Sequence, residues 1–303
     1  TLNPNKPHFM HKSGFVNIIG NPNVGKSTLM NALVGEKLSI ITSKAQTTRH
    51  RILGIVNGDD FQIVFSDTPG ILKPCYKLQE SMMNFVRGAL SDADVLLYVT
   101  DTVERDDERA AEIIDRIRQS GVPTLVVVNK IDLTTQEALE ALVEKWRATL
   151  PDAEIIPISA REGFNIAGLF DRILALLPEG EPFYPKDTLT DKTLRFFASE
   201  IIREKILRNY DKEIPYSCEI EIEEYREEPG IDRISAVIYV ARNSQKGILI
   251  GHKGEKLKKV GRQAREELEE FLRKKVFLQL FVKVSEDWRN DQRQLRRFGY
   301  DPQ

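Results

Sequence analysis

The stretch G-N-P-N-V-G-K-S, from Gly20 to Ser27, contains residue types that could bind a polyphosphate. It fits the phosphate-binding loop G-x-x-x-x-G-K-[ST] at every position, and it lies between an apolar run at 15–19 and a helical pattern at 26–34. Two glycines at a strand-to-helix turn let backbone N–H groups converge on phosphate oxygens at the positive end of the helix. Lys26 would then reach the terminal phosphates, and Ser27 would ligate Mg²⁺. An ordinary glycine-rich turn is the alternative.

A second motif, D-T-P-G, follows the predicted strand 61–65. In a triphosphate site Asp67 would hold Mg²⁺ through a water molecule, and the N–H of Gly70 would bond the γ-phosphate. Between the two motifs lies K-A-Q-T-T-R, a polar stretch at 44–49. A threonine hydroxyl here could bind Mg²⁺ in the presence of the γ-phosphate, because Mg²⁺ prefers hard oxygen ligands. We choose Thr48, with Thr47 as the alternative.

The motif N-K-I-D, at 129–132, follows the predicted strand 125–128 and selects the base. The carboxylate of Asp132 can accept two hydrogen bonds from guanine, whereas adenine offers no such pair of donors. Lys130 would lie along the base, and Asn129 would tie two loops together. Asp132 therefore favours GTP over the alternative of an ATP-dependent kinase or ATPase.

These motifs require a sheet that brings the strand ends to one edge. The apolar runs are continuous rather than alternating, which is typical of strands covered on both faces in a largely parallel, doubly wound α/β sheet. The segment 51–56 could pair as an antiparallel edge. The predicted strands are 15–19, 61–65, 95–99, 125–128 and 155–158, and the predicted helices are 80–90, 106–119, 136–149 and 166–177.

A proline-rich segment separates this domain from a second one. We place the first domain at 13–177, a linker at 178–190, the second domain at 191–285 and a basic and aromatic tail at 286–303. The pattern of the second domain is α-β-β-α-α-β, a smaller α+β module. Its predicted elements are helix 191–209, strands 216–224 and 233–241, a short helix, helix 254–273 and strand 276–284, and the long helix carries an apolar stripe of Leu257, Val260, Ala264, Leu268 and Phe271.

Charge is unevenly distributed along the 303 residues, although the net charge is only −2. Residues 1–180 carry 19 basic and 23 acidic side chains, whereas residues 233–303 carry 17 basic and 9 acidic ones. Such segregation suits a polyanionic partner. With two cysteines, Cys75 and Cys218, no disulfide framework is indicated. No apolar run approaches the roughly 20 residues that span a bilayer.

The four nucleotide motifs, with Ser159-Ala160 after the strand 155–158, resemble those of the bacterial Era family of translation-factor-like GTPases. The resemblance implies GTP and GDP as ligands with Mg²⁺, and a backbone N–H of the Ser159-Ala160 loop at the guanine O6. Lys26, Thr48 and Gly70 would carry catalysis, and Ser27, Thr48 and Asp67 would hold the metal. The remaining nucleotide contacts would come from Gly20, Asn21, Pro22, Asn23, Val24, Gly25, Thr28, Thr68, Pro69, Ile71, Asn129, Lys130, Ile131, Asp132, Ser159 and Ala160.

Ile71 stands where Ras-like enzymes place a water-orienting glutamine, a substitution that Era-like GTPases share. An aliphatic side chain cannot hold water by hydrogen bonding, so we expect slow intrinsic hydrolysis.

The second domain contains G-x-x-G at 251–254, between the short and the long helix. It looks like a KH domain of the helix-first type II topology, which Era proteins carry. Two glycines there would let a single-stranded RNA backbone come close, while cations neutralise it. A tight turn on a solvated basic face is the alternative. The candidate RNA contacts are Lys246, Gly247, Ile248, Ile250, Gly251, His252, Lys253, Gly254 and Lys256.

The family resemblance implies binding of 16S rRNA near its 3′ end and a role in assembly of the 30S ribosomal subunit. We expect a cytoplasmic monomer. A GTPase scaffold that binds anionic lipid on the cytoplasmic face of the inner membrane, through the basic C-terminal region, is the alternative. In the tail, Trp288, Arg289, Arg293, Arg296, Arg297 and Tyr300 could clasp RNA or pack back on the module, and packing is favoured for Trp288.

Overall fold

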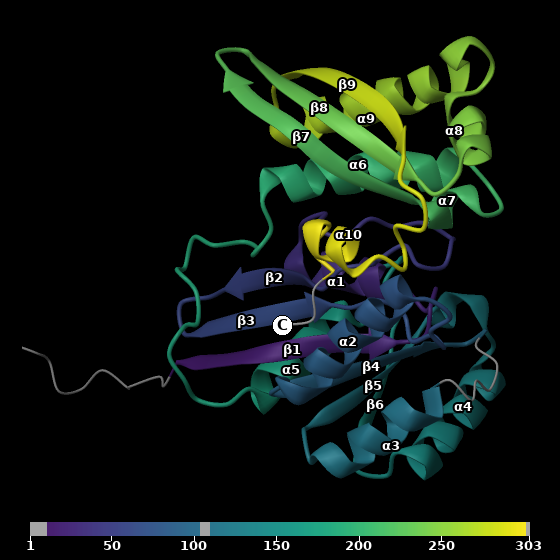
Figure 1. Cartoon of the computed structure of the whole chain (residues 1–303). Helices are drawn as coiled ribbons and strands as arrows, with labels where there is room; N and C mark the ends of the chain where they lie inside the picture. Colours follow the sequence, from purple (N-terminus) through teal and green to yellow (C-terminus); the bar gives the residue numbers. More distant parts are fainter. Residues whose placement is uncertain (1–10, 104–109, 301–303) are drawn as a thin grey trace, which may run out of the picture. The chain divides into compact units, whose positions relative to one another are not determined.

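The computed structural model describes residues 11–103 and 110–300. The chain divides into two compact units (Figure 1). The first unit comprises the described parts of residues 1–39, 51–72 and 85–191. The second unit comprises residues 192–300 together with two segments from earlier in the chain, 40–50 and 73–84. The segment with the two candidate threonines therefore groups with the second unit.

The first unit is built on a six-stranded sheet with the order β2-β3-β1-β4-β5-β6. All neighbouring strands are parallel except β2, which pairs antiparallel with β3 at one edge, as the sequence predicted. The carboxyl ends of the parallel strands therefore meet at one edge of the sheet, where the nucleotide motifs follow them. The strands are β1 Lys12–Gly20, β2 Ile52–Asn57, β3 Phe61–Asp67, β4 Val95–Asp101, β5 Thr124–Asn129 and β6 Glu154–Pro157.

The central strands are covered on both faces. All seven residues of β4 and all six of β5 are buried. Because successive side chains of a strand point to opposite faces, complete burial requires layers above and below the sheet. The helices of this unit supply those layers, and they connect the strands as expected for a doubly wound fold. They are α1 Lys26–Val34, α3 Ala111–Ser120, the 3-10 turn η2 Ile131–Leu133, α4 Gln136–Thr149 and α5 Ile166–Leu176. The helix α2 Lys77–Ser91 begins in the second unit and ends in the first.

The predicted helix 106–119 corresponds to α3, and residues 104–109 lie outside the described part of the chain. Local chemistry explains where α4 begins. The hydroxyl of Thr135 accepts a hydrogen bond from the backbone N–H of Ala138, which satisfies one of the free donors of the first turn.

Hydrogen bonds attach the proline-rich segment 178–190 to the strands of the first unit. Ser13 N–H donates to the carbonyl of Pro178 at 3.1 Å, and Ile55 N–H donates to the carbonyl of Leu189 at 2.8 Å. The side-chain amide of Gln62 donates to the carbonyl of Tyr184 at 2.8 Å. The segment is thus anchored along β1, β2 and β3 of its own unit.

The second unit contains a three-stranded sheet with the order β7-β8-β9. Strands β7 and β8 form an antiparallel hairpin, and β9 lies parallel to β8 at the edge. The helices α7 and α10 were not predicted. The elements of this unit are α6 Leu194–Asn209, α7 Ile214–Ser217, β7 Cys218–Glu228, β8 Ile231–Val240, α8 Asn243–Ile250, the 3-10 turn η3 His252–Gly254, α9 Glu255–Leu272, β9 Lys275–Val284 and α10 Gln292–Arg297.

The core of the second unit lies between the sheet and the helices α6 and α9. Val260, Ala264 and Leu268 of α9 are at most 1% exposed, and Leu257 packs against the same core. The stripe prediction was wrong for Phe271, which is 40% exposed. Its ring lies 5.5 Å from that of Phe197 in α6, at the border of the core.

The C-terminal tail packs on the second unit. The side chain of Trp288 has no exposed surface, and its indole N–H donates to the carbonyl of Ser217 at 3.0 Å. The ring of Phe298 meets the indole edge to face, with centroids 5.7 Å apart. Tyr300 is 1% exposed. The predicted packing of Trp288 is confirmed, and the tail completes the fold of this unit.

Within the described residues, no helix has both the length and the apolar character needed to cross a membrane.

Replacement of Trp288 by alanine should destabilise the second unit by about 3–5 kcal/mol, because it removes a fully buried aromatic side chain and its hydrogen bond. Urea unfolding followed by circular dichroism measures the change. Arg293→Ala, at an exposed position in the same tail, is the control and should stay within about 0.5 kcal/mol of the wild type. Equal stability of the two variants would contradict a core role for Trp288.

Candidate nucleotide site and nucleic-acid interface

The phosphate loop connects β1 to α1 and depends on two glycines with positive φ. Gly20 has φ 153°, and a Cβ atom there would lie 2.1 Å from the carbonyl oxygen of Val99. Gly25 has φ 98°, and a Cβ atom there would lie 2.2 Å from the amide nitrogen of Asn129. Any larger residue would clash with a neighbouring loop or strand. The residues at the ends of β4 and β5 therefore leave room only for glycine at these two positions of the loop.

The polar side chains of the loop converge as the motif predicted. The ammonium of Lys26 donates to the carbonyls of Gly20 and Asn21, at 3.0 and 2.7 Å. The hydroxyl of Ser27, on the first turn of α1, donates to the carboxylate of Asp67 at 2.7 Å. The structure thus brings a hydroxyl from the start of α1 and a carboxylate oxygen from the end of β3 to one point. This pair of hard oxygen donors fits Mg²⁺.

The D-T-P-G loop closes over the phosphate loop. A Cβ atom at Gly70 would come within 2.8–2.9 Å of Pro22, so a larger residue at this position would push the two loops apart. The N–H of Ile71 donates to the carbonyl of Gly20 at 3.1 Å. The side chain of Ile71 is completely buried. It is therefore both apolar and withdrawn from any position where it could hold an attacking water.

The two base-binding loops are tied to the phosphate loop by one side chain. The amide nitrogen of Asn129 donates to the carbonyl of Val24 at 2.9 Å, and its oxygen accepts the N–H of Ala160 at 3.0 Å. In the N-K-I-D loop, Asp132 accepts a hydrogen bond from the hydroxyl of Ser159 at 2.6 Å. The structure brings these predicted residues together, with the Asp132 side chain exposed where a base could reach it.

The remaining predicted contacts lie on the same loops. The ammonium of Lys130 donates to the carbonyl of Asn23 at 2.6 Å. The hydroxyl of Thr68 donates to the carbonyl of Ile18 at 2.7 Å, which fixes the start of the D-T-P-G loop. Ile131 N–H donates to the carbonyl of Ile158 at 3.3 Å. Val24 and Pro69 are buried, and Thr28 lies in the first turn of α1.

Thr47 and Thr48 lie in the segment 40–50, which belongs to the second unit. The hydroxyl of Thr47 donates to the carbonyl of Lys44 at 2.6 Å and is 2.7 Å from the hydroxyl of Thr42. Thr48 is 7% exposed. The choice between the two threonines as a magnesium ligand stays a prediction.

Charged side chains of the second unit hold this segment on both sides of Thr48. Arg203 of α6 donates to the carbonyl of Thr47. The guanidinium of Arg49 is buried, where it donates to the carbonyls of Cys218 and Pro215 at 2.8 and 3.0 Å and pairs with Glu219 at 3.1 Å. A buried guanidinium depends on acceptors for its N–H groups and on an opposite charge beside it. The backbone beside Thr48 is thus anchored to α6 and β7.

His50 closes this anchored segment. Its ring stacks on Tyr300 with centroids 4.2 Å apart, and it meets the edge of Phe196 at 5.6 Å. Burial, together with the positive charges of Arg203, Lys192 and Arg49, lowers the pKa of His50 to about 3. Nearby, burial raises the pKa of Glu219. His50 is therefore neutral at physiological pH.

The G-x-x-G turn of the second unit lies between α8 and α9. Gly251, Lys253 and Gly254 have φ values of 72°, 48° and 79°. A Cβ atom at Gly254 would meet nothing within 4 Å, so glycine is required there for its backbone conformation rather than for space. The turn leaves the backbone open to solvent on the side of Gly254, which is the access that an RNA backbone needs.

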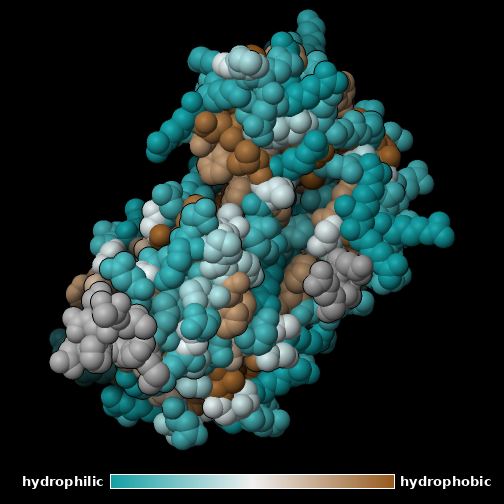
Figure 2. All heavy atoms as spheres, turned by 90° about the vertical axis from the view of Figure 1, so that its left-hand side faces the viewer, coloured by the Kyte–Doolittle hydropathy of each residue, from teal (hydrophilic) through white to brown (hydrophobic). Residues whose placement is uncertain are grey.

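Exposed basic side chains surround this turn. His252, Lys253 and Lys256 are exposed, Lys246 and the backbone of Gly247 lie on the preceding helix, and Ile248 is 44% exposed. Ile250 instead packs against the core of the unit. The face of the molecule in Figure 2 is mainly hydrophilic, with apolar side chains in small groups. The exposed apolar side chains of the second unit include Phe277 and Phe281 on the edge strand β9, which the sequence reading did not assign to the interface.

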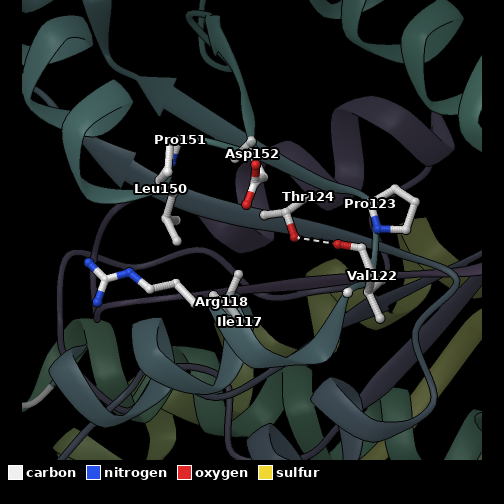
Figure 3. Close-up of a pocket in the computed structure, with 10 residues that line it drawn as sticks. Ile117, Arg118, Val122, Pro123, Thr124, Leu150, Pro151 and Asp152 are labelled. Carbon is white, nitrogen blue, oxygen red and sulfur yellow. Dashed lines mark hydrogen bonds between the residues drawn. The ribbon is translucent and has the colours of Figure 1, made fainter.

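A separate pocket of about 330 Å³ lies at the amino-terminal end of β5. Figure 3 shows Ile117 and Arg118 of α3 on one side of it and Leu150, Pro151 and Asp152 on the other. The hydroxyl of Thr124 donates to the carbonyl of Val122 at 2.9 Å. Because the nucleotide motifs follow the carboxyl ends of the strands, this pocket is not part of the nucleotide site.

The sheet, the phosphate loop and the base-binding loops define a P-loop GTPase domain, and the second unit contains a KH domain. Residues 15–130 match the family described as 50S ribosome-binding GTPase, and residues 213–289 match the KH domain family.

Comparison with known proteins gives the family. The chain is 46% identical over 294 residues to GTPase Era of Syntrophus aciditrophicus, with 96% of each chain covered. It is 45% identical to GTPase Era of Alkaliphilus metalliredigens, over 96% of this chain and 99% of the relative. A solved structure of Era from Aquifex aeolicus bound to GDP·AlF4⁻ has 43% identity, with a TM-score of 0.92 over 95% of this chain and 99% of that chain. The chain belongs to the Era family of GTPases.

A second solved structure holds Era in complex with MgGDPNP and nucleotides 1506–1542 of 16S ribosomal RNA. It is 43% identical to this chain, with a TM-score of 0.92 over 96% of this chain and 99% of that chain.

Sequence reasoning missed the residues that anchor the segment 40–50. Arg49 directly follows the candidate threonines, but its partner Glu219 is 170 positions away. In β7, Glu219, Glu221 and Glu223 alternate with apolar residues, and this pattern offers no signal that the carboxylate of Glu219 is buried.

Asp132→Asn should weaken GTP binding by about tenfold to a hundredfold, because it removes a charged acceptor for the guanine N1–H and N2 groups. The same variant should gain affinity for xanthosine triphosphate, whose base offers an acceptor to the new amide. Titration with fluorescent nucleotide analogues measures both. Ser159→Ala, which removes the hydrogen bond to Asp132 and that from the N–H of Glu162 but keeps the Asp132 carboxylate, is the matched control and should have the smaller effect. Undiminished GTP affinity in Asp132→Asn would refute the base-reading role.

His50 should make the second unit sensitive to acid. The unfolded chain binds a proton at this imidazole below about pH 6.5, while the folded protein does so only near pH 3, so stability is lost as the pH falls between these values. Relative to His50→Gln, the wild-type free energy of unfolding should fall by about 1.4 kcal/mol per pH unit at most.

Urea unfolding between pH 7 and pH 4.5, followed by Trp288 fluorescence in a Trp146→Phe background, measures this dependence within the second unit. His252→Gln, at an exposed position, is the control and should follow the wild type. Parallel pH profiles for wild type and His50→Gln would contradict the burial argument.

Proposed function

We propose that this protein is a Mg²⁺-dependent GTP-hydrolysing switch that binds single-stranded 16S rRNA near its 3′ end through the KH domain and assists assembly of the 30S subunit. The observation that carries the proposal is the presence, in one chain, of a complete set of guanine-nucleotide loops and an open, cation-lined G-x-x-G turn. The Era complex with MgGDPNP and 16S rRNA nucleotides supports both the nucleotide-binding and the RNA-binding part of the proposal, because the Era structure covers 96% of this chain.

The phosphate chemistry rests on residues that already converge. Ser27 and Asp67 would hold Mg²⁺, which when bound supplies positive charge to the phosphate oxygens. Lys26 donates to two carbonyls of the loop and can transfer these hydrogen bonds to phosphate oxygens. The N–H of Gly70 would bond the γ-phosphate. The buried Ile71 contributes no hydrogen bond to the attacking water, which supports a slow intrinsic rate.

RNA binding would use the turn and its flanks. The open backbone at Gly251–Gly254 admits a phosphate group, and Lys246, Lys253 and Lys256 neutralise it. The exposed Ile248 offers apolar surface to an unstacked base. The region 242–265 holds eight basic residues and one acidic residue, so the surface around the turn attracts a polyanion.

Nucleotide state would regulate RNA binding through the segment 40–50. Thr48 is the candidate sensor of the γ-phosphate, and its neighbours are bonded to α6 and β7 of the KH unit. A ligand shifts a conformational equilibrium only by its different affinity for the two states. If Thr48 binds Mg²⁺ only when the γ-phosphate is present, its backbone becomes ordered in that state alone, and the hydrogen bonds of its neighbours connect this ordering to α6 and β7.

We propose a cytoplasmic location, where ribosomal RNA is found, and a monomeric state. Peripheral association with anionic membrane is the second candidate, because the same basic C-terminal region would attract acidic lipid headgroups.

The test is binding of the full chain, with GTP analogue and Mg²⁺, to an RNA of nucleotides 1506–1542 of 16S rRNA. Gly254→Asp should abolish binding, because it adds a negative charge and strains a residue with φ 79°. Lys253→Ala keeps the fold and should lower the slope of log affinity against log salt by about 0.7 per lost phosphate contact. Arg147→Ala, on the exposed surface of α4, is the matched control and should leave the slope unchanged.

Binding of the same proteins to phosphatidylglycerol vesicles tests the alternative of membrane association. Retained RNA affinity in Gly254→Asp would overturn the assignment of the turn. Binding of the protein to these vesicles, with no binding to the RNA, would favour the membrane alternative.

A further inference from the structure

Asp101 ends β4 beside the base-binding loops. The parallel register of β4 and β5 places Asp101 next to Asn129, one residue before Lys130. The side chain of Asp101 is only 6% exposed, and its carboxylate accepts a hydrogen bond from the ammonium of Lys130. Its other oxygen accepts the N–H of Val103 at 3.0 Å. The carboxylate is therefore fixed in one orientation before any ligand binds.

Lys130 is held at both its ends. Its ammonium donates to the carbonyl of Asn23 in the phosphate loop at 2.6 Å as well as to Asp101. Its own carbonyl accepts the hydroxyl of Thr102 at 3.1 Å. The backbone of Lys130 has φ 62°, a conformation that a non-glycine residue adopts at a cost of roughly 1–3 kcal/mol. Two successive residues at the end of β4 thus brace one lysine, through its side chain and through its main chain.

We infer that Asp101 is a positioning residue of the nucleotide site, which acts through Lys130. The inference rests on the proposed guanine-nucleotide function. A lysine side chain is a flexible four-carbon stem with a strongly hydrated charge, and it loses entropy when one conformation is selected. Asp101 selects that conformation in advance, so that the stem of Lys130 already forms a wall of the base site when the nucleotide enters. Asp101 itself touches only Lys130 and Val103 among these groups.

The burial of the Asp101 carboxylate gives the interaction its weight, and the side chain of Lys130 is 30% exposed. An exposed ion pair contributes little, because water screens it and the side chains must be ordered. At 6% exposure the carboxylate of Asp101 is nearly withdrawn from water, so it depends on Lys130 for its charge partner. Loss of the carboxylate leaves the ammonium of Lys130 with the Asn23 carbonyl as its remaining partner among the contacts described above.

A double-mutant cycle tests the inference. The affinity and dissociation rate of a fluorescent GDP analogue are measured, with Mg²⁺, for wild type, Asp101→Ala, Lys130→Ala and the double variant. Asp101→Ala should raise the dissociation constant by about tenfold to a hundredfold. In the Lys130→Ala background the same change should cost no more than about twofold, because the two residues act as a unit.

Asp101→Asn separates charge from shape. The amide oxygen can still accept the N–H of Val103 but carries no charge for Lys130, so the loss of affinity should be smaller than in Asp101→Ala and still depend on Lys130. Asp115→Ala, which breaks an exposed pair with Arg118 on α3, is the matched control and should leave GDP affinity unchanged. The unfolding midpoint of the nucleotide-free protein is measured for every variant.

Unchanged GDP affinity in Asp101→Ala would overturn the inference, and so would an equal loss in the presence and absence of Lys130. Failure of the wild type to bind guanine nucleotides would instead overturn the proposed function.

Discussion

The side-chain amide of Asn129 is the interaction on which the nucleotide site depends. Its nitrogen bonds the phosphate loop at Val24 and its oxygen bonds the last base-binding loop at Ala160. The same nitrogen occupies the space where a Cβ atom of Gly25 would lie. The glycine of the motif is thus required by a side chain from another strand. Three loops that are distant in the sequence become one rigid surface because a single planar amide has a donor and an acceptor on opposite sides.

This arrangement explains why so much of the first unit could be predicted. The residues that bind phosphate and guanine are contiguous in short motifs, and each motif directly follows an apolar run that is long enough for a strand. In a parallel sheet, strand ends meet at one edge, so the motifs converge without further information. The order of elements in the KH domain followed from the same reasoning, since a change from continuous to alternating apolar residues indicates a sheet with one open face.

The features that could not be predicted depend on side chains whose partners are distant in the sequence and are brought close only by the folded structure. Nothing near Arg49 in the sequence shows that its charge is buried against Glu219, and charged residues are rarely buried at all. The pairing of Asp101 with Lys130 likewise depends on how β4 aligns with β5. The choice between Thr47 and Thr48 is of the same kind, because neighbouring hydroxyls differ only in the direction that the backbone gives them. Phe271 shows the opposite error, since helical spacing cannot show where a core ends.

The second unit is discontinuous in sequence, and this has a consequence for synthesis of the chain. Arg49 leaves the ribosome long before Glu219, because 170 residues separate them. At ordinary rates of translation this delay is roughly ten to thirty seconds. During that time the Arg49 guanidinium lacks the acceptors that it later contacts in the second unit. The packing of this unit is completed only after Trp288 and Tyr300 have been synthesised. Contacts of such high sequence separation also slow folding, so completion of this unit is a late event in synthesis of the chain.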